Sequence, residues 1–586
     1  MLAKTEPLAS LVDDWLTRFD RALAMADGPA LRGLFHADSH WRDLLALTWT
    51  IQTVEGRDAI VSALGASAPG AGPSGFRVDP ERTAPRRVIR AGTEAVEAIF
   101  RFETDRGIGS GVLRLTERSG DGGGAKAWTL MTALEELKGY EESVGRKRPS
   151  GQSYARDFRG PNWLDLRNSS VAYADRDPAV MVIGAGQAGL SIGARLKQLQ
   201  VDTLIVDRWP RVGDNWRKRY HALTLHNQVH VNHLPYMPFP PNWPTYIPKD
   251  KLAGWFEAYA DTMELNVWSG ADFQGGAYDE KAQRWTVQVR KADGSVRKMH
   301  PRHVIMATGL SGPPSIPDIP SLKNYKGTVQ HSTQYQDGDA WSDKRVLIIG
   351  TGTSGHDIAQ DLHSSGAKVT LVQRSTTMVV NIEPSAQLPY ALYDEGPSLE
   401  DCDLITTSVP LSLARKSHQL LTEQARKLDQ DLLDGLERAG FRLDFGDDGT
   451  GWQFKYLTRG GGDYFNVGCS ELIVSGEVGL MQYSDIAEFV AEGARLRDGR
   501  VVPADLIVLA TGYRSLESVV GSLFGQEVAS RVGPVWGFGE EQELRNMFMQ
   551  TPQPGMWFIA GSFAQCRIYS KYLALQIKAI EEGLLA

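Results

Sequence analysis

The stretch that decides the fold is Gly184-Ala185-Gly186-Gln187-Ala188-Gly189, and its pattern recurs as Gly350-Thr351-Gly352-Thr353-Ser354-Gly355. Each copy follows a short apolar run and precedes a stretch of helical character: 179–183 and 190–199 for the first copy, 346–349 and 356–362 for the second. The first glycine makes a tight turn, the second lets the backbone approach a pyrophosphate, and the third lets helix and strand pack closely. We therefore predict two Rossmann-like dinucleotide-binding domains in an α/β protein. The alternative, two glycine-rich loops that bind nothing, is disfavoured by this context.

The residue that ends the next strand distinguishes the two nucleotides. The run 202–207 ends at Asp207, whose carboxylate can accept hydrogen bonds from an unmodified ribose, as in FAD or NAD. The run 367–374 ends at Arg374, a cation that suits a 2′-phosphate. We therefore expect FAD at the first site and NADPH at the second.

The composition excludes several classes of function. With 42% hydrophobic and 23% charged residues the chain is typical of a globular protein, and a net charge of −8 disfavours a nucleic-acid-binding surface. Its three cysteines form no Cys-x-x-Cys pair, which indicates a reducing compartment and disfavours a dithiol reductase. No apolar run approaches the roughly 18 residues that span a bilayer. We expect a cytoplasmic protein without stable membrane insertion.

Residues 1–140 follow a different pattern. Apolar residues recur at helical spacing over 8–23, and a second helix is expected near 56–64. Alternation at 96–102 and 128–132 predicts strands, with 120–124 as a hairpin tip. Helices followed by an antiparallel sheet indicate an α+β module.

The expected domain order follows from these patterns and from two Ala-Thr-Gly stretches, which contain Thr308-Gly309 and Thr511-Gly512. Such stretches are typical of the points where the chain of a flavoprotein returns between two nucleotide domains. The predicted divisions are the α+β module 1–140, a linker 141–177, the FAD domain 178–340, an inserted NADPH domain 341–495, and the rest of the FAD domain 496–586.

A family resemblance is carried by Tyr325, Gly327, His331 and Tyr335. Their spacing is similar to the Phe-x-Gly-x-x-x-His-x-x-x-(Tyr or Phe) fingerprint of flavin-containing monooxygenases, with Tyr325 in place of the first Phe. The stretches 223–246 and 465–477 resemble the YUCCA branch of that family. The resemblance runs from about 178 to 586. It departs from the family at Gly213-Asp214-Asn215-Trp216, where Gly-Gly-x-Trp is usual, so how closely this loop follows the flavin pyrophosphate is open.

The N-terminal module resembles the cone-shaped nuclear-transport-factor-like, or polyketide-cyclase-like, fold. That resemblance makes His36, Asp38 and Asp43 candidates for a second pocket. Appended modules of this kind are more often structural or dimerising, and a homodimer through this domain is a candidate assembly.

The family resemblance implies an NADPH-dependent flavin monooxygenase. NADPH reduces FAD, the reduced flavin holds dioxygen as a C4a-hydroperoxide, and one oxygen passes to a small organic substrate. A 2-oxo acid such as indole-3-pyruvate is one expected substrate, and an amine or sulfide that is N- or S-oxygenated is the alternative. Two further readings are a binding or scaffolding protein with an inactive flavin half and a bifunctional enzyme with an N-terminal pocket.

The resemblance also implies the site residues. Asn227 or its neighbour His226 is expected to position the cofactors, and His331 is either catalytic or a packing link between domains. A last helix over 569–584 is expected to direct its N-terminus at the flavin. The histidines of 221–233 lack an interleaved acidic ligand, so no metal is expected. The expected cofactor-binding residues are Gly184, Gly186, Gly189, Asp207, Gly213, Trp216, Thr308, Gly309, Gly350, Gly352, Gly355, Arg374, Thr511, Gly512 and Gln565.

Overall fold

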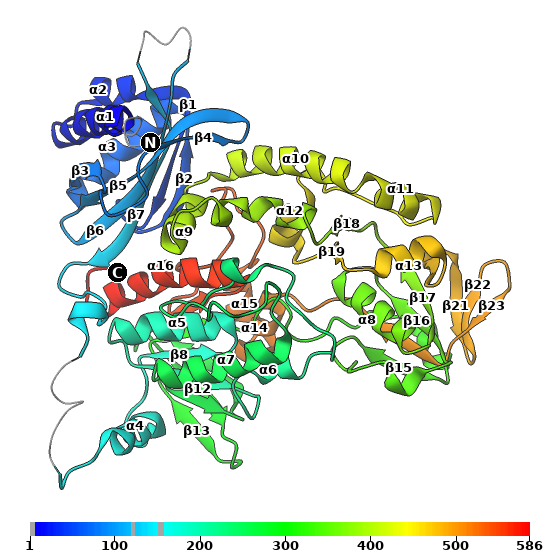
Figure 1. Ribbon diagram of the computed structural model, residues 1–586. Coiled ribbons are helices and arrows are strands. Elements are labelled where there is room, and N and C mark those ends of the chain that lie inside the picture. The colour runs from blue at the N-terminus through cyan, green and yellow to red at the C-terminus, as the bar shows by residue number, and fades with distance from the viewer. Residues whose placement is uncertain (1–5, 119–123, 150–157, 586) are drawn as a thin grey trace.

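The computed structural model describes residues 6–118, 124–149 and 158–585. Figure 1 shows an N-terminal α+β domain above two parallel sheets that lie side by side, with a helical segment between that domain and the second sheet. In the part of the chain that is described, every helix is too short or too polar to cross a lipid bilayer. The α/β class expected from the two fingerprints is confirmed.

The N-terminal domain is built on a seven-stranded sheet in the order β2-β1-β7-β6-β5-β3, with β4 paired to β5. Its helix α1 (Glu6–Ala24) buries Trp15 and Phe19, which pack against Phe35 and Phe76. The helical spacing in the sequence thus marked a real core face. The expected hairpin tip 120–124 falls mainly outside the described residues. The other elements are α2 (Gly28–Leu34), β1 (Phe35–Leu44), β2 (Ile51–Glu55), α3 (Arg57–Ala71), β3 (Ser74–Val78), β4 (Arg86–Arg90), β5 (Thr93–Glu103), β6 (Gly107–Thr116) and β7 (Lys126–Leu137).

The first parallel sheet has five strands in the order β10-β9-β8-β14-β25. All residues of β8 and β14 are buried, as expected of parallel strands that are covered on both faces. Helix α5 lies against α16 on one side, and an antiparallel sheet covers the other. The strands are β8 (Val180–Ile183), β9 (Thr203–Asp207), β10 (Val267–Ser269), β14 (His303–Met306) and β25 (Met556–Phe558); the helices are α5 (Gln187–Gln198), α6 (Asp214–Arg217), α7 (Lys249–Thr262), α14 (Leu516–Phe524), α15 (Gln526–Val532) and α16 (Phe563–Glu581); the antiparallel sheet is β11 (Asp272–Asp279), β12 (Arg284–Arg290) and β13 (Val296–Met299).

The second parallel sheet has the order β15-β24-β16-β17-β20. Two of its strands, β15 (Thr328–His331) and β24 (Leu506–Leu509), lie outside the interval 341–495 that we expected for this domain. The chain therefore enters the sheet earlier and leaves it later than the fingerprint alone suggested. The remaining elements are β16 (Arg345–Ile349), α8 (Thr353–Ser364), β17 (Lys368–Gln373), α13 (Cys469–Ser475), β20 (Gly479–Gln482), β21 (Ile486–Val490), β22 (Gly493–Leu496) and β23 (Val501–Pro503).

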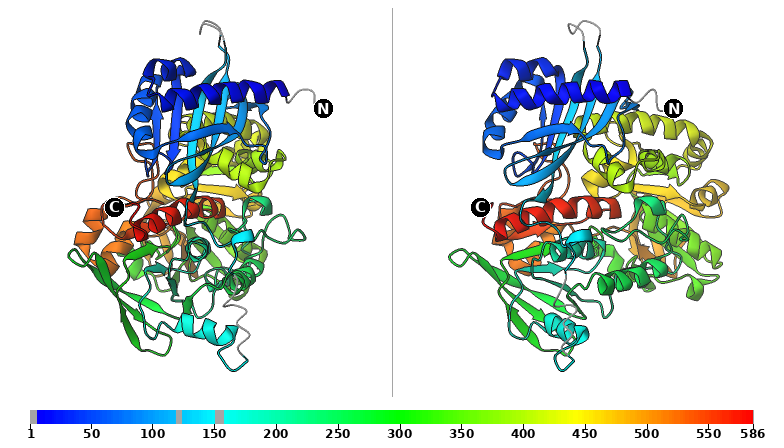
Figure 2. Two further views of the ribbon diagram at one scale, coloured as in Figure 1. Left: turned by 90° about the vertical axis from the view of Figure 1, so that its left-hand side faces the viewer. Right: turned by 60° about the vertical axis from the view of Figure 1, so that its left-hand side comes forward.

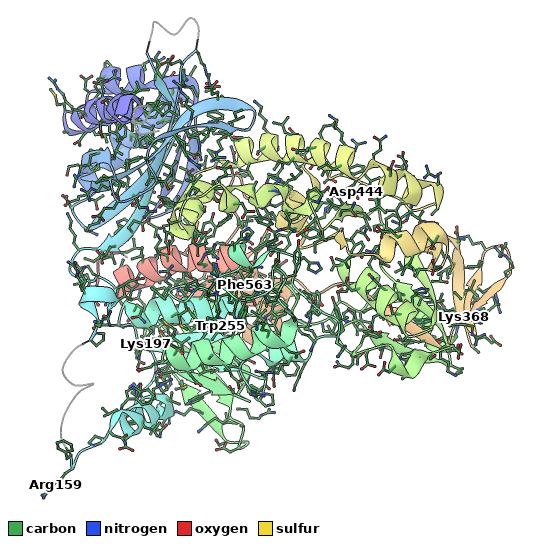
Figure 3. All side chains as sticks on the ribbon, viewed as in Figure 1. Arg159, Lys197, Trp255, Lys368, Asp444 and Phe563 are labelled. Carbon is green, nitrogen blue, oxygen red and sulfur yellow. The ribbon has the colours of Figure 1, made fainter. Side chains whose placement is uncertain are left out.

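A helical segment follows β17 and lies over the space between the two sheets (Figure 1). Asp444 in Figure 3 marks the turn that precedes its last helix, α12. The segment begins with the short strand β18 and ends with β19, which pairs with β18 in parallel before the chain returns to the second sheet. The elements are β18 (Met378–Asn381), η7 (Ser385–Asp394), α9 (Leu399–Thr407), α10 (Leu411–Leu428), α11 (Gln430–Arg438), α12 (Gly451–Arg459) and β19 (Asp463–Asn466).

Two helices differ from what the sequence indicated. The segment expected as a linker contains α4 (Trp163–Ala172), which begins with a capping box formed by Asn162 and Asp165 and buries no residue. Its lack of a buried face explains why no apolar periodicity revealed it. The last helix begins at Phe563, not near 569, because Ser562 and Gln565 form a capping box there. Figure 3 shows Phe563, the first residue of this helix, near the centre of the molecule.

The N-terminal domain rests on the rest of the chain near α16. Both views in Figure 2 show this domain stacked above α16. Strand β7 contacts α16 and strand β6 contacts α9. The ammonium of Lys571 on α16 also binds the Glu135 carboxylate on β7 at 2.7 Å.

Candidate active site

Both glycine fingerprints form tight turns that leave no room for a side chain at their first and third glycines. Gly184 and Gly350 have φ of 108° and 122°, in the region that favours glycine. A Cβ at Gly189 would lie 1.8 Å from the Gly184 carbonyl oxygen, and one at Gly355 would lie 2.2 Å from that of Gly350. The second glycine of each copy, Gly186 or Gly352, caps the following helix. Each turn is thus a backbone cradle at a helix N-terminus, which fits a pyrophosphate.

The first cradle has further polar groups that fit a dinucleotide such as FAD. Asp207 ends β9, and its carboxylate accepts hydrogen bonds from the Ala185 and Trp209 amides at 2.6 and 2.8 Å, which fixes its orientation. Burial raises the pKa of the Asp207 carboxyl. Among the described residues, the Thr308 hydroxyl and the Trp216 indole N–H are buried without a partner. Both residues line the adjoining cavity, so a ligand there can satisfy them.

The neighbouring loop differs from the usual Gly-Gly-x-Trp pattern without losing its turn. Gly213 has φ of 88°, and a Cβ there would lie 2.4 Å from the Ala253 carbonyl oxygen. The Asp214 carboxylate turns away to bind the Arg217 guanidinium at 2.7 Å. Asp214 is buried in this contact and does not line the cavity, whereas Asn215 and Trp216 do.

The second cradle is followed by two exposed cations. Arg374 comes directly after β17, and the Arg442 guanidinium donates a hydrogen bond to the Arg374 carbonyl oxygen at 2.6 Å. Thr511 and Gly512 follow β24 and line the same cavity, and the Thr511 hydroxyl donates to the Ser315 carbonyl at 2.7 Å. This arrangement fits a phosphorylated dinucleotide, with Arg374 available to a 2′-phosphate.

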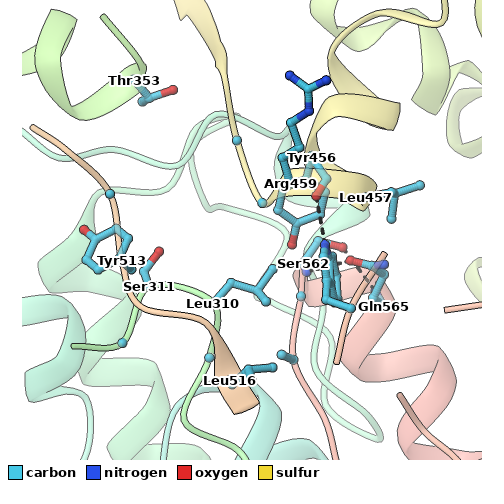
Figure 4. A pocket seen from close by; sticks show the side chains of 18 of the residues that line it. Leu310, Ser311, Thr353, Tyr456, Leu457, Arg459, Tyr513, Leu516, Ser562 and Gln565 are labelled. Carbon is cyan, nitrogen blue, oxygen red and sulfur yellow. Dashed lines mark hydrogen bonds between the residues drawn. The ribbon is translucent and has the colours of Figure 1, made fainter. Parts of the chain in front are cut away.

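One cavity of about 1950 Å³ joins the two cradles. The other predicted residues that reach it are Gly309, at the first cradle, and Gln565, at the start of α16. Figure 4 shows residues from both nucleotide domains and from α12 facing this space. The N-terminal domain contributes Arg42, Arg90 and Arg114 to the wall. We call this cavity the chamber. Gly189 and Gly213 stand behind its wall, where they permit close packing.

Asn227 and His226 both line the chamber, on the side of the helical segment. The Asn227 side-chain amide donates to the Tyr390 hydroxyl at 3.2 Å. The His226 ring meets the Phe465 ring edge-on, with centroids 5.7 Å apart. Asn227 thus takes part in a polar contact inside the chamber, while the His226 ring makes an aromatic one.

His331 connects two elements of the second sheet and lies outside the chamber wall. Its Nδ1 accepts the Thr333 amide at 3.2 Å, so Nε2 carries the proton and donates to the Gly512 carbonyl at 3.1 Å. Burial lowers the pKa of His331, which favours this neutral form. The geometry supports a positioning role for His331, because it holds the loop that contains Gly512.

The N-terminus of α16 opens into the chamber. The Ser562 hydroxyl accepts the Gln565 amide, and the Gln565 side chain accepts the Ser562 amide at 3.0 Å. The Ser562 amide also donates to the Tyr456 hydroxyl from α12 (Figure 4). The positive end of a long helix therefore meets the chamber at the edge of the first nucleotide site.

The chamber residues that sequence reasoning missed include Tyr390, Tyr456 and Asp463. They come from η7, α12 and β19 of the helical segment. The only local signal was the run Gly460-Gly461-Gly462 before Asp463, which marks a close turn but not its place in the fold.

The N-terminal candidates make contacts typical of structural residues. The Asp43 carboxylate accepts hydrogen bonds from the Leu47 and Thr48 amides and from the Thr48 and Thr132 hydroxyls. Burial raises its pKa to about 6. His36 is buried against Thr116, and Asp38 binds the Arg118 guanidinium at 2.6 Å near the surface. Each of these three side chains thus has its own partners within the domain.

The histidines of 221–233 have separate partners. His233 Nδ1 accepts the Phe239 amide at 2.9 Å, and His230 lies 3.6 Å from the Asp394 carboxylate. Within the described ranges, no group of three or more His, Cys, Asp or Glu side chains could hold a metal ion.

Comparisons with known proteins agree with this geometry. Residues 181–392 match the pyridine nucleotide-disulphide oxidoreductase family. Indole-3-pyruvate monooxygenase YUCCA1 of Oryza sativa subsp. japonica is 30% identical over 361 residues, which cover 61% of this chain and 82% of the relative. The probable indole-3-pyruvate monooxygenase YUCCA1 of Arabidopsis thaliana is 30% identical, with 57% of this chain and 75% of the relative covered.

A solved structure shows the same fold. Cyclohexanone monooxygenase from Rhodococcus sp. Phi1, bound to NADP⁺, superposes with a TM-score of 0.51 at 16% identity over 70% of this chain and 85% of that chain. The disulphide chemistry in the name of the matched family requires paired cysteines, and Cys402, Cys469 and Cys566 are all unpaired here. The chain belongs to the YUCCA-like branch of the flavin-containing monooxygenases and is an FAD- and NADPH-dependent monooxygenase.

Proposed function

We propose that this monooxygenase oxidatively decarboxylates an aromatic 2-oxo acid such as indole-3-pyruvate. The names of the plant relatives support this substrate class. One oxygen atom of O₂ enters the new carboxylate, the other leaves as water, and C1 of the 2-oxo acid leaves as CO₂. NADPH supplies the two electrons and FAD, when bound, supplies the activation of dioxygen.

The observation that carries this proposal is a group of aromatic side chains in the wall of the chamber. Phe465 packs against Trp452 with centroids 4.7 Å apart, and Tyr390 lies 6.0 Å from Trp452. These rings line the chamber beside Asn227, so an aryl side chain can stack there. The polar edge formed by Asn227 and Tyr390 then orients the oxo-acid end.

The roles of individual residues follow from their positions. We propose that the first cradle, with Asp207 and Trp216, holds FAD and that the second, with Arg374, holds NADPH. Asn227 orients the reacting groups through Tyr390, and His331 positions the Gly512 loop. The N-terminal domain closes the chamber and does not carry a second reaction.

A second candidate function is N-oxygenation of an amine. It is favoured by Asp463, whose carboxyl group lines the chamber and can attract an ammonium group. A sulfide is uncharged, so Asp463 does not favour its binding.

The direct test is product analysis. The FAD-loaded enzyme is incubated with NADPH and either indole-3-pyruvate or an N-alkylamine, with an oxygen-free incubation as the control. We expect CO₂ and the acid shortened by one carbon from indole-3-pyruvate. An N-oxide without any decarboxylation product would replace this proposal by the amine reading, and product from neither substrate would reject both.

Two broader proposals concern the setting of the enzyme. The three buried, unpaired cysteines support a cytoplasmic location. A homodimer through the N-terminal domain remains a proposal, although β6 and β7 of its sheet already contact α9 and α16 of the same chain.

A further inference from the structure

Asp463 occupies an unusual position in the chamber. It is the first residue of β19, directly after Gly462. Side chains alternate along a strand, so Asp463 shares a face with Phe465, whereas Tyr464 faces the other way and stacks on His356 of α8. The Phe465 face is the one that contacts His226 and Trp452. The Asp463 side chain is therefore directed to the substrate side of the chamber.

Several groups surround this carboxyl group. From α12 come Lys455 and Tyr456, and from η7 comes Tyr390. Arg459, at the end of α12, is bound to Asp447 at 2.7 Å near the surface. On α8 the Thr353 hydroxyl donates to the Asp463 main-chain carbonyl at 3.2 Å, not to its side chain.

The nearest cation does not neutralise Asp463. The Lys455 ammonium is bound to the Asp444 carboxylate at 2.6 Å. Among the described residues, none donates a hydrogen bond to the Asp463 carboxyl group. Burial raises its pKa to about 7, and the charge of Lys455 only partly opposes this effect. The group can thus change its charge near neutral pH while it faces the substrate space.

We propose that Asp463 determines which substrate charge the chamber accepts. The protonated carboxyl group is a neutral hydrogen-bond donor and admits the carboxylate of a 2-oxo acid. The ionised carboxylate repels that anion and favours an ammonium group. This proposal deepens the proposed function and rests on it for the identity of the anionic substrate.

The first experiment uses the wild-type, FAD-loaded enzyme saturated with NADP⁺. Binding of two probes of similar shape and opposite charge, indole-3-propionate and tryptamine, is measured by calorimetry at a pH of about 6 and about 8.5. We expect indole-3-propionate to bind about tenfold more weakly at the higher pH, and tryptamine to bind more tightly there, because the carboxyl group ionises between the two. The same direction of change for both probes would overturn the proposal.

Matched variants assign the effect to one side chain. D463N keeps a neutral hydrogen-bonding group, and we expect its affinity for indole-3-propionate to be the same at both pH values. D447N removes the exposed carboxylate that binds Arg459 at the end of α12, and it should retain the wild-type pH dependence. H226Q removes the imidazole that contacts Phe465 on this wall and should also retain the wild-type pH dependence. If H226Q abolishes the dependence, or D463N keeps it, Asp463 is not the determinant.

A pH effect on the binding of the coenzyme must be distinguished from one on the binding of the substrate. The affinity for NADP⁺ alone is measured at the same two pH values. A large pH dependence in NADP⁺ affinity, with none in probe binding, would show that Asp463 responds to the coenzyme and would overturn the proposal. Neither probe is turned over, so this result does not depend on whether indole-3-pyruvate gives product.

Discussion

The Arg42 guanidinium binds both carboxylate oxygens of Glu543, at 2.9 and 2.6 Å. Arg42 lies on β1 of the N-terminal domain, and Glu543 lies in the loop before β25. Both line the chamber, and their side chains are only 8% and 13% exposed. The pair therefore joins the N-terminal domain to the flavin domain at the wall of the active site.

Breaking this pair should destabilise the protein. R42A or E543A leaves a buried charge without its partner, so we expect each to lower the free energy of unfolding by about 3 to 5 kcal/mol. Chemical denaturation of the two single variants and the double variant measures the coupling. The exposed pair of Arg495 and Glu488 is the matched control. R495A should lower the free energy of unfolding by less than about 1 kcal/mol. Equal losses for R42A and R495A would contradict the buried coupling.

Arg374 should determine the coenzyme preference. R374A removes a charge-assisted contact to the 2′-phosphate, so we expect NADPH binding to weaken by about 1.5 to 3 kcal/mol while NADH binding changes little. K368A, at the opposite end of β17, is the control. An unchanged preference in R374A, with a loss in R442A, would assign the phosphate to Arg442 instead.

Asp463 should make stability depend on pH. The unfolded carboxyl group ionises near its ordinary value of 3.8, while the folded one keeps its proton to about 7. The folded state binds more protons between these values, so the free energy of unfolding falls as pH rises through that window. D463N removes the titrating carboxyl group and, with it, this dependence of stability on pH. As the pH rises from about 4 to about 8, the free energy of unfolding of D463N should increase by about 1 to 2 kcal/mol relative to that of the wild type. Water in the chamber screens the charge and keeps this difference small. A constant difference across pH would contradict the raised pKa.

Substitutions in the two cradles should affect FAD binding and NADPH binding separately. In G189A the new methyl group meets the Gly184 carbonyl oxygen, so we expect loss of bound FAD; in G355A it meets that of Gly350, so we expect weaker NADPH binding with FAD retained. G254A is the control, because a Cβ there meets no atom within 4 Å and alanine favours the α7 helix. Flavin content after purification and NADP⁺ titration measure the two effects. Loss of FAD in G355A, with NADP⁺ binding intact, would reverse the assignment.

The nucleotide-binding framework could be predicted from the sequence because its signals are local. A strand, a glycine turn and a helix lie within one short stretch. Asp207 ends the strand that follows the first turn, and Arg374 comes directly after the strand that follows the second. The structure brings the two fingerprints to one chamber. The true start of α16 was also present in the sequence, as Ser562 followed three residues later by Gln565, and was overlooked.

The rest of the site could not be predicted because it depends on contacts between distant segments. Asp463, Tyr390 and Tyr456 reach the chamber only because the helical segment folds back over it. Arg42 and Glu543 are 501 residues apart, and nothing near either residue indicates its partner. Helix α4 is capped but buries no side chain, so hydrophobic periodicity gave no signal for it.

The central claim is that the two nucleotide sites open into one chamber, so that hydride can pass from one cofactor to the other. The most direct measurement is anaerobic rapid mixing of the FAD-loaded enzyme with NADPH, followed through the visible absorbance of the flavin. We expect one equivalent of NADPH to bleach the flavin completely, and R374A to bleach at a much higher NADPH concentration. Saturable NADPH binding with a flavin that stays oxidised would contradict the account.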